Sequence, residues 1–132
     1  MPGFSDYWEN EVLDHLFNKG AYAPPTVLYV ALSAADPGDD GSGAAEPAGG
    51  SYARAETSNA DWAGAFGGTV SNADAVEFAQ ATSAWGMITH FALYDAALGG
   101  NLLAFGPLTD ARTVAAGDTV RFGPGDLIVT LN

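Results

Sequence analysis

A loop rich in carboxylates is the first candidate for chemistry in this chain. Asp36, Asp39 and Asp40 lie in a stretch of glycine, proline and serine, and calcium binds several carboxylate and carbonyl oxygens on a flexible loop. The spacing departs from the Asp-x-[Asp/Asn]-x-[Asp/Asn]-Gly pattern of calcium-binding loops. We therefore regard the three residues as a weak calcium candidate and expect the loop to be solvated or to face a partner.

The residues that could support catalysis form no recognisable arrangement. Catalysis by a serine needs a histidine base oriented by an acid, and neither Ser71 nor Ser83 lies in a Gly-x-Ser-x-Gly motif. His90 lies inside an apolar run, where a hydrogen-bonded residue of the sheet is expected, and His15 lies on the acidic side of a predicted helix. The 16 acids offer many carboxylate pairs without singling one out. We expect no enzymatic activity and no cofactor.

The overall charge excludes several classes of partner. The chain has 132 residues, no cysteine, and 4 basic against 16 acidic side chains, which gives a formal net charge of −12. So few cations cannot neutralise a row of phosphates, and we expect no binding to nucleic acid or to an anionic membrane. The absence of cysteine excludes disulfides and thiolate metal sites. The first residues lack the basic segment of a secretory signal, and the apolar run over 26–35 is too short to span a bilayer.

Five residues are candidates for contact with another protein. Large aromatic side chains contribute much of the binding energy at interfaces, and Trp62 and Phe66 lie in an irregular stretch rich in alanine and glycine. Tyr7, Trp8 and Leu16 belong to the N-terminal segment. There they either cover one end of a β domain or pack against a neighbouring subunit. A sugar-binding face of exposed aromatic residues is the alternative for Trp62, Phe66 and Trp85, of which Trp85 is expected in the buried core.

The N-terminal segment has the pattern of one α-helix over residues 5–19. Ser5 can cap the helix, and Asp6 and Glu9 place negative charge at the positive end of the helix dipole. Gly20 predicts where the helix ends. Apolar residues with helical spacing form one stripe, namely Trp8, Val12, Leu13, Leu16 and Phe17.

The rest of the chain has the pattern of an antiparallel β domain. It combines 17 glycines and 7 prolines with a hydrophobic content of 48%, so there are many turns and enough apolar residues for a core. Turn residues recur about every eight to twelve positions. We predict a mainly β fold, an antiparallel β-sandwich or barrel-like domain over residues 26–132, with a long acidic Gly/Pro loop over 36–50. Residues 1–132 are expected to form a single domain.

Short runs of β-branched and aromatic residues bounded by turn residues predict the individual strands. These runs cover residues 26–33, 52–56, 75–78, 87–94, 101–105 and 127–131. Two hairpins are also predicted. One passes through the loop 96–100, and the other joins 113–114 to 119–122 through the turn 115–118.

Several motifs are similar to those of one protein family. They are Phe4-Ser-Asp-Tyr-Trp through Phe17, Leu28-Tyr-Val-Ala-Leu-Ser33 followed by Ala35-Asp36-Pro37, Gly50-Ser-Tyr-Ala-Arg54, Trp85-Gly86-x-Ile88-Thr-His-Phe-Ala-Leu-Tyr-Asp95, Gly99-Gly-Asn-Leu-Leu103, and Ala116-Gly-Asp118 through Phe122 to Gly125-Asp-Leu127. The chain resembles a family of small virion structural proteins of tailed bacteriophages, usually labelled tail fibre or minor structural protein. The resemblance implies a structural role and a place in the virion.

Two places in the particle fit this resemblance. Our first hypothesis is a capsid decoration, or cement, protein that binds the outside of the major capsid shell and stabilises the assembled state. Compactness and the absence of repeats or coiled-coil heptads favour it. The alternative is a tail-fibre or tail-tip component that takes part in host attachment, with tail proteins as partners. A remote alternative is a carbohydrate-binding or hydrolytic module.

The resemblance also implies where the protein is made and how it assembles. We expect synthesis in the cytoplasm of the host bacterium, followed by incorporation into the virion. A homo-oligomer is expected, and analogy with the cement proteins of other phages suggests a trimer.

Overall fold

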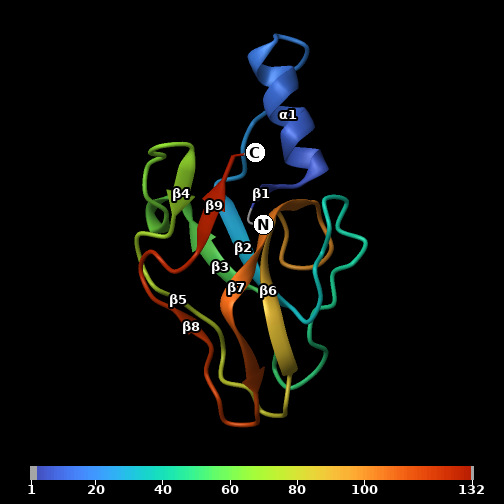
Figure 1. Ribbon diagram of the computed structural model, residues 1–132, viewed down its shortest axis with the longest axis vertical. Coiled ribbons are helices and arrows are strands. Elements are labelled where there is room, and N and C mark those ends of the chain that lie inside the picture. The colour runs from blue at the N-terminus through green and yellow to red at the C-terminus, as the bar shows by residue number, and fades with distance from the viewer. Residues whose placement is uncertain (1–2, 132) are drawn as a thin grey trace.

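The computed structural model describes residues 3–131, in which one helix stands at the end of an antiparallel β structure (Figure 1). The first elements in chain order are β1 (Gly3–Phe4), α1 (Asp6–Leu16), β2 (Val27–Ser33), β3 (Ala55–Ser58) and the single-turn 3-10 helix η1 (Asn59–Asp61). They are followed by β4 (Thr69–Ser71), β5 (Val76–Glu77), β6 (Gly86–Tyr94), β7 (Leu102–Val114), β8 (Arg121–Phe122) and β9 (Ile128–Thr130).

The strands form one main sheet and two short ladders. The main sheet has five strands in the order β1-β7-β6-β2-β3, and the ladders are β4-β9 and β5-β8. All of these pairings are antiparallel. The predicted mainly β fold with a helix at the N-terminus is confirmed, whereas the sheets of residues 3–131 do not close into a barrel.

The main core lies between the five-stranded sheet and the two ladders. Side chains alternate across a strand, so Val30 and Leu32 on β2 point into this core while Ala31 between them points to the opposite face. Phe91 and Leu93 on β6 and Val129 on β9 complete the contact between the two layers. The sheet is therefore buried on both faces at its centre.

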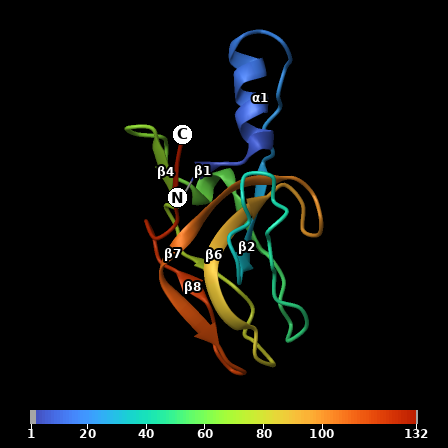
Figure 2. The same cartoon turned by 45° about the vertical axis from the view of Figure 1, so that its right-hand side comes forward.

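The long acidic loop between β2 and β3 covers the second face of the sheet (Figure 2). A smaller apolar cluster lies under it and includes Ala92, Tyr94 and Leu102. The loop approaches so closely that a side chain at Gly41, whose φ is +79°, would contact Leu102 at 3.4 Å. The predicted loop over 36–50 is confirmed. The loop also contributes to the fold, because it shields apolar residues from water.

Several strand predictions need correction. Residues 102–114 form one strand, β7, where the sequence suggested two short runs. The predicted hairpin through 115–118 is wrong, because β8 pairs with β5 in the register Val76 to Phe122 and not with the end of β7. The strand predicted over 52–56 begins only at Ala55, and β1 and β4 were not predicted. Short strands of this kind depend on distant partners, which local patterns do not contain.

The helix ends earlier than residue 19. Ser5 caps α1 as predicted, and its Oγ accepts a hydrogen bond from the Trp8 N–H at 3.2 Å. The last helical residue is Leu16, and Asn18 adopts a left-handed conformation with φ 59°, so the chain leaves the helix before Gly20. Among the described residues, no helix is long and apolar enough to cross a membrane.

Candidate interaction surface

The base of α1 is tied to the main sheet by hydrogen bonds of Ser5. Its backbone N–H donates to the Leu103 carbonyl oxygen at 2.8 Å, and its buried hydroxyl donates to the Leu102 carbonyl oxygen. The next N–H, of Asp6, donates to the Asp39 carbonyl oxygen in the acidic loop at 2.9 Å. These contacts fix the direction in which the helix leaves the body of the molecule.

The two tryptophans predicted to contact a partner lie on the same groove. Trp8 packs on Phe4 with ring centroids 4.8 Å apart, and its indole N–H donates to the Tyr22 hydroxyl at 2.9 Å. Trp62 follows η1, and its indole N–H donates to the Thr57 hydroxyl at 2.9 Å. Both indoles are half-buried, and their hydrogen bonds hold the rings as fixed walls.

We call the cavity between these two indole rings the apolar groove. It has a volume of about 500 Å³ and runs between the base of α1, the segment leading to β4, and the end of β9. Its lining residues are Phe4, Trp8, Pro25, Thr26, Leu28, Asn59, Trp62, Ala63, Gly64, Ala65, Gly68, Val70, Leu93, Val129 and Leu131. None of these lining residues, all of which belong to the described range 3–131, carries a charged side chain. Such a groove suits an apolar partner surface.

The far end of α1 is a second apolar surface. Leu13, Leu16 and Phe17 are 52%, 71% and 70% exposed, and β7 and β1 are the strands against which α1 chiefly packs. In both views the helix projects from the body (Figures 1 and 2). Of the two alternatives left open for the apolar stripe, coverage of one end of the β domain does not extend to this last turn.

The remaining interface candidates have different surroundings. Phe66 is 90% exposed at the turn that leads into β4, so its aromatic ring is free to meet a partner. Tyr7 is half-buried and packs edge-on against Tyr22 with ring centroids 6.4 Å apart. Burial raises the pKa of the Tyr7 hydroxyl, and the charge interaction with Tyr22 adds to this effect. Tyr7 thus supports the segment that returns from the helix.

Two of the three aspartates of the calcium candidate, Asp36 and Asp40, have carboxylates that are hydrogen-bonded within their own loop. The Asp36 carboxylate accepts the Gly38 N–H, and the Asp40 carboxylate accepts the Ser42 N–H, each at 2.9 Å. The Ser42 hydrogen bond lowers the pKa of Asp40. Within residues 3–131, no group of three or more histidine, aspartate or glutamate side chains is placed to hold a metal ion. The loop stays the weak calcium candidate that the sequence suggested, and nothing in the structure tests it.

Arg54 and Glu46 form an ion pair that sequence reasoning missed. Arg54 Nη2 lies 2.6 Å from Glu46 Oε1, and Arg54 Nε donates to Glu46 Oε2 at 3.0 Å. The guanidinium carbon lies 3.7 Å from the centre of the Tyr94 ring, and Nη1 donates to the carbonyl oxygens of Ala96 and Gly99. This arrangement links the acidic loop to the loop between β6 and β7.

Two physical effects oppose each other at Glu46. Burial alone would raise the pKa of its carboxyl group, but hydrogen bonds from Arg54 and Tyr52 lower the pKa below its ordinary value. The Tyr52 hydroxyl donates to Glu46 at 2.6 Å and accepts the Leu32 N–H at 3.0 Å. The only sequence signal for this pair was an arginine within an otherwise acidic stretch.

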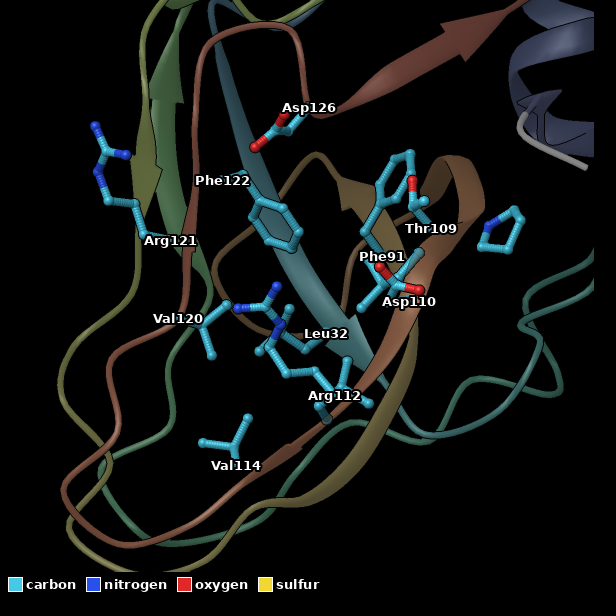
Figure 3. Close-up of a pocket in the computed structure, with 13 residues that line it drawn as sticks. Leu32, Phe91, Thr109, Asp110, Arg112, Val114, Val120, Arg121, Phe122 and Asp126 are labelled. Atoms are coloured by element: carbon cyan, nitrogen blue, oxygen red, sulfur yellow. The ribbon is translucent and has the colours of Figure 1, made fainter.

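A second cavity, of about 310 Å³, lies beside β7 and β8. Figure 3 shows the Arg112 side chain reaching into it near Phe122, while Arg121 points outward. Arg121 Nε lies 4.0 Å from the Glu77 carboxylate on β5. Asp126, whose carboxylate accepts the Gly123 N–H at 2.8 Å, lines the same cavity. This cavity is lined by charged residues of both signs, so it differs in chemistry from the apolar groove. None of the five predicted interface residues lines it.

Comparison with known proteins gives one family. A search of curated proteins found no match. The family model described as "Podophage GP4 fiber I protein gp80" matches residues 3–130, so the match includes every residue of the groove except Leu131. This chain belongs to that family of phage structural proteins.

Proposed function

We propose that the protein is a non-enzymatic building block of a fibre on a tailed-phage virion, joined to its neighbours through the apolar groove and the far end of α1. The structural observation behind the proposal is a charge-free groove beside an exposed apolar helix end, on a chain of net charge −12. In such an acidic protein, uncharged apolar surfaces are where another subunit can approach without repulsion.

The place in the virion rests on the family. Its description contains the word "fiber", which favours the fibre over the head. The chain itself is small and has neither repeats nor heptads, so it supplies a compact module and not a long shaft.

Capsid decoration is the second candidate, with the major capsid protein as partner. Its support is the same lack of repeats, together with a compact β fold that stabilises neighbours by adding buried interface. The two candidate functions predict different copy numbers and different locations in the virion, so measurements on purified virions can distinguish them.

Gold labelling of a tagged copy in purified virions, combined with quantitative gel densitometry, tests the proposal. We expect label on the tail or fibres and a band much weaker than that of the major capsid protein. Even labelling of the head with a band of comparable strength would favour decoration. Absence from purified particles would contradict both candidates, and turnover of host polysaccharide by the isolated protein would return attention to the hydrolytic alternative.

A further inference from the structure

The C-terminal end of α1 lacks the packing that normally stabilises a helix. The helix has 11 residues, and isolated helices shorter than about 12–15 residues are marginal in water. Its first turns are anchored through Ser5, through the contact of Trp8 with Phe4, and through the contacts of Tyr7 and Trp8 with Tyr22. The segment 13–20, which we call the helix tip, exposes Leu16 and Phe17 at 71% and 70%. A second surface is needed to cover it.

Charge points to a second copy of this chain as the source of that surface. The helix tip holds one carboxylate, Asp14, and one ammonium group, Lys19, so it is balanced on a chain of net charge −12. The lining of the apolar groove, as described within residues 3–131, is uncharged. These are two surfaces that copies of such an acidic chain can bring together without opposing carboxylates.

The positions of the two surfaces also fit each other. Trp8 belongs to α1 and lines the groove, so each helix rises directly beside the groove of its own copy. Figures 1 and 2 place α1, β4 and the end of β9 at the same end of the molecule. A neighbouring helix that runs antiparallel beside α1 therefore brings its tip to the groove at the base of α1, and the same contact can be returned.

We propose that the helix tip of one copy docks in the apolar groove of another, with Leu13, Leu16 and Phe17 packed between Trp8 and Trp62 of the neighbour. Because the contact is returned, it relates two copies by a twofold axis and favours a closed pair over an open filament. This inference deepens the proposed function, on which it rests for the view that the groove is a protein contact.

Cross-linking of full-length chains tests the contact directly, because the natural sequence has no cysteine. A tagged Leu16→Cys chain is mixed with an untagged Ala65→Cys chain and treated with a short bis-maleimide. Both positions are exposed, and Ala65 lines the groove. We expect a cross-linked product that contains one chain of each kind. The matched control replaces Ala65→Cys by Met87→Cys, an exposed position near the start of β6 at the opposite end of the molecule, and should give no such product.

Two further variants measure the strength of the contact by light scattering and sedimentation. Leu16→Ser removes an anchor from the tip, and Ala65→Trp fills the groove; each should raise the dissociation constant by about ten- to a hundredfold, as expected for the loss of one buried apolar side chain. Met87→Ser should leave the oligomer unchanged. A wild-type chain that stays monomeric at every soluble concentration would overturn the inference, as would equal cross-linking of both pairs. Neither result would bear on whether the protein lies in the fibre, which the labelling of virions decides separately.

Discussion

Trp8 and Trp62 face the same groove from different parts of the chain, and each fixes its ring with one hydrogen bond of 2.9 Å to a hydroxyl group, Tyr22 for Trp8 and Thr57 for Trp62. Both rings leave apolar surface open to the groove while their polar atoms are satisfied. This is a favourable state for an interface residue, because the indole N–H does not need water when a partner covers the ring.

The hydrogen bond to Trp62 gives the first prediction. Thr57 is 3% exposed, and its hydroxyl accepts from Trp62 and donates to the Leu28 carbonyl oxygen at 2.8 Å. Thr57→Val keeps the shape but leaves both partners unsatisfied, so the free energy of unfolding should fall by about 1–3 kcal/mol in urea denaturation. Thr113→Val, at an exposed position on β7, is the control and should change the value by less than about 0.5 kcal/mol. Equal values for the two variants would mean that the Thr57 contacts contribute nothing.

The cap of α1 gives a second prediction. Ser5 is 1% exposed, and its hydroxyl serves both the helix and β7. Ser5→Ala should lower the free energy of unfolding by about 1–2 kcal/mol, as for other lost helix caps, and should also weaken self-association, because the helix loses its fixed direction. Ser42→Ala in the exposed loop is the control. Loss of stability without any change in association would show that the cap does not position the helix.

The Arg54 ion pair predicts that arginine cannot be replaced by lysine there. Arg54 is 7% exposed at its side chain and contacts Glu46, Tyr94 and two carbonyl oxygens. Arg54→Lys keeps the charge but loses the paired hydrogen bonds and the flat contact with Tyr94, so we expect a loss of about 2–4 kcal/mol. Arg121→Lys changes an exposed pair and should cost less than about 1 kcal/mol. Chemical denaturation of both variants measures the difference.

The same pair predicts how stability depends on pH. The folded-state pKa of Glu46 lies below its ordinary value of 4.5, so the ionised carboxylate stabilises the fold. This contribution is complete above about pH 4.5 and is lost as the pH falls through the lowered folded-state pKa. Unfolding curves measured from pH 6 downward should therefore lose stability below about pH 4.5. In Glu46→Gln this part of the decline should be absent. If the pH profile of the variant matched that of the wild type, Glu46 would not contribute to the loss of stability in acid.

Local patterns predicted the features that short stretches of chain determine. Ser5 and the apolar stripe identified the helix and its start, and the turn residues around 36–50 identified the long loop. The helix was predicted to end at residue 19 but ends at Leu16, because Asn18, and not Gly20, adopts the left-handed conformation. Asparagine adopts this conformation less readily than glycine, so glycine was the expected choice.

Features that depend on distant contacts could not be predicted in the same way. The pairing of β8 with β5 joins residues that are far apart in the chain, and the short strand β4 exists because it pairs with β9. The Arg54 pair needs both the acidic loop and the loop after β6 to be in place. For the interface, sequence reasoning identified Trp8 and Trp62 separately; that they line one groove became evident only from the fold.

A high-resolution electron cryomicroscopy map of the purified virion would show whether the helix tip lies in the apolar groove of a neighbouring copy. We expect density for this β fold within a fibre, arranged as a closed group of copies, with the helix tip of one copy buried between Trp8 and Trp62 of the next. Density in which α1 points into solvent and the apolar groove is empty would contradict it.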